Sequence, residues 1–183
     1  QDEVVRKVKK GASIIHLIED LPKQGSLPIS ALLAVGSVHQ RLVKLGLRSD
    51  ANIIVTTSSA RDTHQIACLI GFGATAVYPT LAYQTILDLT DRNELKGDAH
   101  ENCSRYRKGI NKGLLKIISK MGISTISSYR GSQLFEIVGL DKDVVDLCFT
   151  NTESRIKGKK FKDLDLELRS LNEYARSNIA DMK

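Results

Sequence analysis

The chain has 183 residues, of which 42% are hydrophobic and 26% charged, and its net charge is +6. This length suffices for one domain with a buried core, and that core must be aliphatic, because only 5% of the residues are aromatic and tryptophan is absent. No apolar run reaches the roughly 20 residues of a membrane span. The basic residues are scattered without interleaved aromatic residues, so we expect neither a membrane protein nor a nucleic-acid-binding protein.

In the first half of the chain, short apolar runs alternate with amphipathic segments. The runs predict buried strands at residues 13–18, 52–57 and 74–78. Apolar residues at steps of three and four predict helices at about residues 28–45, 60–70 and 81–89. A loop is expected at residues 21–27, with Ser26 or Leu27 capping the first of these helices and Gly46 ending it.

The second half begins with a polar excursion at residues 91–99. The pattern then predicts, in order, a helix at residues 101–121, a strand at 123–127, two short helices within 131–149, a basic connector at 151–162 and a helix at 164–180. Gly109 and Gly113 fall inside the long helix, which predicts close packing of the backbone there. The alternation of strands and helices is typical of a parallel α/β fold, either part of a (βα) barrel or a doubly wound sheet.

Residue 1 is Gln, and the first readable element is a helix end that runs directly into a strand. This start is what we expect of a chain that begins within a domain. Cys68, Cys103 and Cys148 lie far apart and form no CxxC motif, which predicts free thiols in a reducing compartment. The histidines show none of the spacings of metal ligands.

Ser59, Asp62 and His64 lie close together and invite comparison with a catalytic triad. Three residues at one helix start cannot easily line up as nucleophile, base and orienting group. We therefore expect a helix cap, with Ser59 at the N-cap and Asp62 three residues later. The motifs predict no catalytic, cofactor-binding or metal-binding residue in this chain.

The segment Gly122–Gly131 (GISTISSYRG) offers the most suggestive site. Small polar residues after a predicted strand can present backbone N–H groups to an anion, and Arg130 could add a bidentate contact. Helix capping with a buried structural ion pair is the competing interpretation. The candidate residues for an anion site or a domain interface are Lys120, Ser128, Tyr129, Arg130 and Gly131.

Several stretches resemble the large subunit of glutamate synthases. The strongest match is residues 111–140, NKGLLKIISKMGISTISSYRGSQLFEIVGL, and residues 28–40, 60–79 and 144–156 are also similar, in the same order and spacing. Two places depart from the family pattern. Residues 57–59 (TSS) replace an acidic motif, and residues 157–160 (KGKK) replace a glycine-rich linker.

The resemblance implies a piece of an enzyme that converts glutamine, 2-oxoglutarate and reductant into two glutamates. It implies parallel βα units that form part of a (βα)-barrel-like central domain, lying between a glutamine amidotransferase domain and an FMN-binding domain. Residues 1–156 would then be the C-terminal part of the central domain. Residues 157–183 would be a basic linker and helix leading toward the FMN domain.

The resemblance places the cofactors elsewhere: FMN and an iron–sulfur cluster belong to the full-length enzyme, and none to this piece, which we expect to be inactive alone. The implied partners are the amidotransferase and FMN domains of the same polypeptide, and ferredoxin or an NADPH-dependent small subunit. The implied location is the cytoplasm, or the plastid in a plant or alga. A stand-alone phosphate-binding or scaffold module is the alternative.

Overall fold

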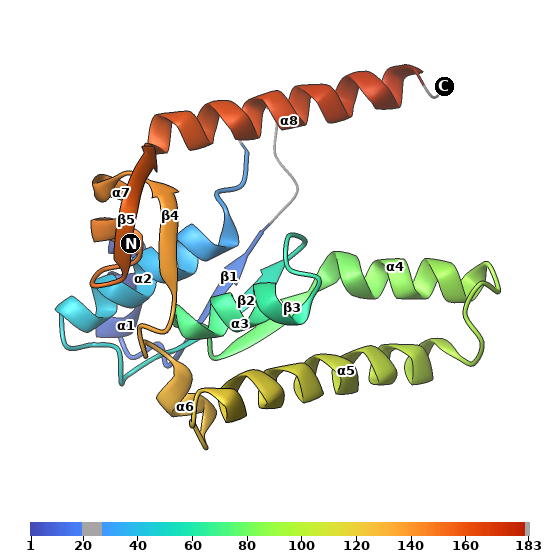
Figure 1. Cartoon of the computed structure of the whole chain (residues 1–183), viewed down its shortest axis with the longest axis horizontal. Coiled ribbons are helices and arrows are strands. Elements are labelled where there is room, and N and C mark those ends of the chain that lie inside the picture. Colours follow the sequence, from blue (N-terminus) through green and yellow to red (C-terminus); the bar gives the residue numbers. More distant parts are fainter. Residues whose placement is uncertain (20–26, 182–183) are drawn as a thin grey trace.

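A computed structural model describes residues 1–19 and 27–181 (Figure 1). The expected loop at residues 21–27 and the proposed cap Ser26 therefore lie almost entirely outside the described residues. The elements of the first half are α1 (Asp2–Lys9), β1 (Ile14–Ile18), α2 (Ala31–Lys44), β2 (Asn52–Thr57), α3 (Thr63–Gly71), β3 (Ala76–Pro79) and α4 (Thr80–Asp91). The later elements are α5 (Ala99–Lys120), α6 (Ile126–Tyr129), β4 (Glu136–Leu140), α7 (Lys142–Cys148), β5 (Glu153–Lys159) and α8 (Phe161–Asp181).

The first sheet is parallel and has the order β1-β2-β3. Its strands form from apolar, β-branched runs, and alternate residues of each strand point to opposite faces. Ile15, Ile53 and Val55 point to the face that the helices cover, and all three are buried. Val35, Leu42 and other residues of α2 and α3 pack against this face and complete an aliphatic core.

The second sheet contains β4 and β5, which are hydrogen-bonded to each other in parallel and are connected in the chain by helix α7. A smaller core forms beneath it from Ile137, Val144, Val145, Cys148 and Phe149. Helix α7 packs against α2, so the two sheets share α2 as a common support. The predicted α/β class with parallel strands is confirmed.

Three expectations for the second half of the chain are wrong. The strand expected at residues 123–127 is a loop followed by the short helix α6, and one of the two helices expected within residues 131–149 is strand β4. The connector expected at residues 151–162 contains β5. The other predicted strands and helices exist, with ends that differ by a few residues.

A helical hairpin and a single long helix extend from this body. Helices α4 and α5 run side by side as a long hairpin, and α8 lies along the opposite side of the molecule in Figure 1. None of the helices in the described part of the chain is long and apolar enough to cross a membrane.

Candidate functional site

The carboxyl edge of the first sheet carries a small polar cluster. The carboxylate of Glu19, just after β1, accepts hydrogen bonds from the backbone N–H of Ser58 (2.9 Å) and from the hydroxyl of Thr57. The Thr57 hydroxyl is fully buried and also lies 2.8 Å from the Ser59 hydroxyl. Glu19 therefore ties the end of β1 to the end of β2, at the edge where parallel α/β folds place their sites.

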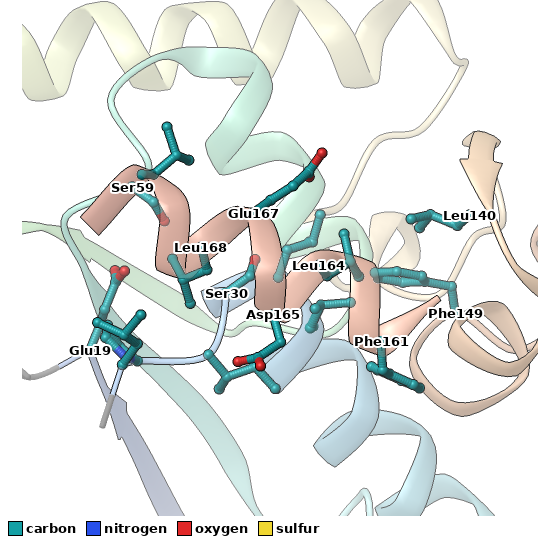
Figure 2. Close-up of a pocket in the computed structure, with 16 residues that line it drawn as sticks. Glu19, Ser30, Ser59, Leu140, Phe149, Phe161, Leu164, Asp165, Glu167 and Leu168 are labelled. Carbon is teal, nitrogen blue, oxygen red and sulfur yellow. The ribbon is translucent and has the colours of Figure 1, made fainter. Parts of the chain in front are cut away.

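A groove of about 640 Å³ opens beside this cluster (Figure 2). It lies between the start of α2, the ends of β4 and α7, and the first turns of α8. Its apolar walls include Leu27, Pro28, Ile29, Leu32, Leu33, Leu140, Phe149, Phe161, Leu164, Leu168 and Leu171. Its polar residues are Glu19, Ser30, Ser59, Asp165 and Glu167.

The carboxylates around the groove already have protein partners. Asp165 pairs with Arg169 at 2.8 Å, and Glu167 pairs with Lys159. Glu19 is held by the backbone and hydroxyl of β2. The groove can therefore accept an apolar side chain, and these paired carboxylates are not arranged as an acid–base couple.

The residues singled out in the sequence divide into two groups. Tyr129 is buried and packs edge-on against Phe135, and the N–H of Gly131 donates to the carbonyl of Gly71 at 2.8 Å. Arg130 donates from one terminal nitrogen to the hydroxyl of Thr75 at 3.0 Å. These three residues fix the end of α6 onto the turn between α3 and β3.

Lys120 and Ser128 do not join that contact. Lys120 is the exposed last residue of α5. Ser128 is also exposed, and its hydroxyl lies 2.8 Å from that of Thr125. The structure thus places the candidate segment at the amino edge of the first sheet, since Thr75 precedes β3, rather than at the carboxyl edge.

A histidine–arginine pair beside this segment was missed from the sequence. The Arg48 side chain donates to Nδ1 of His39 (2.9 Å) and to the carbonyls of Ala51 (2.5 Å) and Gly73 (2.9 Å). These bonds join the end of α2 to the starts of β2 and β3. No local motif marks the pair, because the acceptors are backbone carbonyls that only the fold brings together.

Burial, together with the nearby charges of Arg48 and Arg130, lowers the pKa of His39 to about 4. Burial, with the nearby charge of Arg130, also lowers the pKa of Arg48. His39 is therefore neutral at pH 7, with Nδ1 as the acceptor. Each of the three side-chain nitrogens of Arg48 donates to a protein acceptor, so this pair acts as a structural clamp.

The cap of α3 differs from the expected one by three residues. The N-cap is Asp62, whose carboxylate accepts from the N–H of Gln65, while the side chain of Gln65 accepts from the N–H of Asp62. Asp62 and Gln65 therefore form a capping box, and the cap expected from Ser59 and Asp62 is wrong. Ser59 bonds to Thr57, and His64 lies 3.7 Å from the Cys68 sulfur, so the triad residues form no relay.

The described residues do not fit an iron–sulfur cluster or another metal centre. Cys68, Cys103 and Cys148 belong to three different helices, and no three His, Cys, Asp or Glu side chains of the described chain converge on one point. Burial raises the pKa of the Cys148 thiol to about 11, and burial with the charge of Asp62 raises that of Cys68, so both stay protonated at pH 7.

The family model of the glutamate synthase central domain matches residues 1–141. The chain is 42% identical over 153 residues to the NADPH glutamate synthase large chain of Bacillus subtilis, covering 84% of this chain and 10% of that one. It is 45% identical over 156 residues to ferredoxin-dependent glutamate synthase 1 of Arabidopsis thaliana, a match that covers 80% of this chain and 10% of that protein. It is 36% identical over 174 residues to the NADH glutamate synthase of Saccharomyces cerevisiae, a match that covers 91% of this chain and 8% of that protein.

The chain therefore belongs to the glutamate synthase central domain family. It spans about a tenth of the length of the relatives that it matches. The resemblance read from residues 28–156 is confirmed.

Proposed function

We propose that this chain acts as part of the central domain of a glutamate synthase, the enzyme that makes two glutamates from glutamine, 2-oxoglutarate and reductant. The observation that carries the proposal is the family match over residues 1–141, together with 36–47% identity to glutamate synthases across most of the chain. Because the chain spans a tenth of those proteins, the reaction belongs to the whole polypeptide, and this segment supplies structure.

The segment links the amidotransferase domain to the FMN domain. Residues 1–156 form the C-terminal part of the central domain, and residues 157–183 lead toward the FMN domain. The extended helix α8 supports this role, since its first turns contact the body while Leu166, Leu171 and Tyr174 remain exposed. Exposed apolar residues along one helix suit a neighbouring domain.

The order β1-β2-β3 supports a barrel-like central domain. Consecutive parallel strands that lie side by side, with their helices on one face, are the repeating unit of a (βα) barrel. A doubly wound sheet would reverse its strand order and place helices on both faces. The order of these three strands is the observation that supports the barrel-like arrangement.

The cofactors and the electron donor belong to the rest of the enzyme in this proposal. FMN and the iron–sulfur cluster lie in the neighbouring domain, and ferredoxin or an NADPH-dependent small subunit delivers electrons. The relatives include ferredoxin-, NADPH- and NADH-dependent enzymes, so similarity alone leaves the donor open. The location is the cytoplasm or, in a plant or alga, the plastid, as the chloroplastic relatives suggest.

The segment from Lys120 to Gly131, with Ser128, Tyr129 and Arg130, forms an interface with a neighbouring domain. Arg130 supports this role because only one of its nitrogens bonds to a described residue, which leaves donors for a partner. The full-length enzyme with Arg130→Ala should hydrolyse more glutamine per glutamate formed, because the two active sites lose their coupling.

The matched control is Arg92→Ala, which removes an exposed arginine whose partner, Asp88, lies on its own helix. Glutamine consumption and glutamate formation are measured in parallel for both variants. An unchanged ratio in the Arg130 variant would contradict the interface role.

A further inference from the structure

The outward side of α5 carries a row of unpaired lysines. Lys108, Lys112 and Lys116 are spaced by four residues, which places them on one side of the helix over about 12 Å. All three are exposed, and none forms an ion pair within the described part of the chain. The opposite side of α5 packs Ile110 and Leu114 against the core of the first sheet, so the lysine row points outward.

The lysine row lacks the acidic neighbours that other cations in this chain have. Four exposed pairs lie four residues apart within helices: Glu3–Lys7, Asp88–Arg92, Glu101–Arg105 and Asp165–Arg169. After Glu101, however, no Asp or Glu occurs before Glu136, whereas residues 102–135 contain seven Lys and Arg residues. Like charges four residues apart repel each other, so the row is stabilised by carboxylates brought from outside the segment.

Two uncharged residues on the same side of α5 suit close contact. Gly109, three residues before Lys112, is exposed and has no heavy atom within 4 Å of its would-be Cβ atom. A glycine inside a helix weakens the helix, and it allows another backbone to approach closely. Leu115, three residues after Lys112, is an apolar side chain that is 62% exposed among these cations. The lysine row therefore borders both an apolar contact and a gap in the layer of side chains.

We propose that this side of α5 docks an acidic surface of another domain of the parent glutamate synthase polypeptide. Carboxylates of that surface pair with Lys108, Lys112 and Lys116. An apolar side chain of the same surface covers Leu115, and its backbone comes closest at Gly109. The proposal rests on the proposed function, which supplies a polypeptide about ten times the length of this chain.

The position of the lysine row supports an occupant from the same polypeptide. Lys120 continues the four-residue spacing of the row and begins the segment that we propose as a domain interface. Helix α5 lies along the margin of the molecule opposite α8, so this side is accessible to a neighbouring domain (Figure 1). One continuous contact would then run along α5 and into that segment.

The charges disfavour a second copy of the chain as the occupant. Each copy carries a net charge of +6, so two copies repel each other. The carboxylates of Asp165 and Glu167 on α8 are already paired with cations of their own chain. A nucleic acid is also disfavoured, because residues 107–120 contain no aromatic residue on which a base could stack.

Amine labelling tests whether the lysine row is covered. The 183-residue chain and the full-length synthase are treated with an acylating reagent at the same pH and temperature, and each labelled lysine is identified by mass spectrometry. We expect Lys108, Lys112 and Lys116 to react at least about fivefold more slowly in the full-length enzyme, because their ammonium groups are paired and covered. Equal rates in the two proteins would overturn the proposal.

Zero-length coupling tests the chemistry of the partner. A carbodiimide joins an amine to a carboxylate only where the two groups touch. In the full-length enzyme, the lysines of the row should form amide links to Asp or Glu residues outside the 183 residues of this chain. If slow labelling is accompanied by no such link, the covering surface is not acidic and the proposal is wrong.

A pair of charge-reversal variants tests the energetic effect of the row. Both variants change the net charge equally; the first reverses the row, Lys108→Glu/Lys112→Glu/Lys116→Glu, and the second reverses scattered exposed lysines, Lys10→Glu/Lys44→Glu/Lys142→Glu. In the isolated chain both should retain the helical circular dichroism of the parent sequence. In the full-length enzyme the row variant should have the lower thermal midpoint, and equal midpoints would contradict the docking. Labelling and coupling need no substitution, so they decide the question even if the row variant does not fold.

Two further outcomes separate this proposal from its alternatives. Slow labelling of the row in the isolated chain, accompanied by a dimeric mass in light scattering, would overturn the proposal by identifying a second copy as the occupant. Glutamate formation from glutamine and 2-oxoglutarate by the full-length protein tests the proposed function separately. An active enzyme with equal labelling rates would refute the docking surface alone.

Discussion

His39 has the most restrictive surroundings of the histidines, enclosed by the α3–β3 turn and by two arginines. A Cβ atom at Gly73 would lie 2.5 Å from the imidazole ring, and the φ of Gly73 is +126°, so only glycine fits there. Arg48 holds the ring through Nδ1. The ring has neither the space nor the electrostatic environment to become protonated at neutral pH.

This environment predicts a loss of stability in mild acid. The pKa of His39 is about 4 in the folded chain and 6.5 in the reference state, so the unfolded chain binds the proton more tightly. The stabilisation is complete above pH 6.5 and is lost as the pH falls toward 4. We expect a loss of about 2 kcal/mol, below the full linkage value because the ring is partly accessible to solvent.

Urea unfolding at pH 7.5 and pH 4.5 measures this change. The control is His39→Gln, which keeps an acceptor for Arg48 but does not titrate. Its free energy of unfolding should change less between the two pH values than that of the parent sequence. If the two proteins lose equal stability, His39 does not cause the acid sensitivity.

Glu19 makes a second residue-level prediction. Glu19→Ala removes the acceptor that serves the backbone of Ser58 and the buried hydroxyl of Thr57, and should cost about 1–3 kcal/mol. Glu19→Gln keeps an acceptor oxygen and should cost less. Thermal unfolding of the two variants separates these outcomes, and an equal loss would show that the negative charge, rather than the acceptor, stabilises the edge.

At the scale of elements, glycines show where helices approach closely. A Cβ atom at Gly36 in α2 would collide with the backbone carbonyl of Cys148 at the end of α7. A Cβ atom at Gly113 in α5 would lie 2.5 Å from the Thr63 hydroxyl of α3, which confirms the close packing predicted there. Gly109 has no heavy atom within 4 Å of its would-be Cβ, so the same prediction is wrong at that position.

Replacing glycine by alanine should have opposite effects on stability at Gly36 and at Gly109. Gly36→Ala should destabilise the chain by about 1–3 kcal/mol, because a backbone collision cannot be relieved by rotating a side chain. Gly109→Ala should stabilise it by up to about 1 kcal/mol, because alanine is the better helix former and meets no obstacle. Denaturant unfolding compares them, and a similar shift in both would refute the packing of α2 against α7.

Elements with their own apolar pattern were predictable, and elements defined by their neighbours were not. Residues 52–57 form a buried strand because five of the six residues, Ile, Ile, Val, Thr and Thr, are β-branched. The ISTIS run at residues 123–127 alternates like a strand, but it enters α6 instead, where the Thr125 and Ser128 hydroxyls meet. Strand β5 has no apolar run, and it forms by pairing with β4, aided by Arg155 between Glu136 and Glu153.

The candidate site shows the same division. The motif around Tyr129–Gly131 was found from the sequence, but its position at the amino edge of the sheet follows from α6, which the pattern missed. The clamp formed by His39 and Arg48 depends on carbonyls at Ala51 and Gly73 that only the fold brings together. Long-range backbone acceptors leave no local pattern in a single sequence.

At the scale of the whole molecule, the chain combines two parallel sheets on a shared helix α2, with a helical hairpin and α8 extending from the body (Figure 1). Its carboxyl-edge groove is apolar and its carboxylates are paired, while the first sheet is open on one face. These features suit a segment that positions neighbouring parts of an enzyme.

The central claim is that this chain is a structural segment of glutamate synthase whose flavin chemistry lies elsewhere in the polypeptide. The most direct test is the visible absorbance spectrum of the purified chain after incubation with FMN and exhaustive dialysis. The account predicts a colourless protein with no retained flavin. One equivalent of bound flavin would contradict it and would place a cofactor site within these 183 residues.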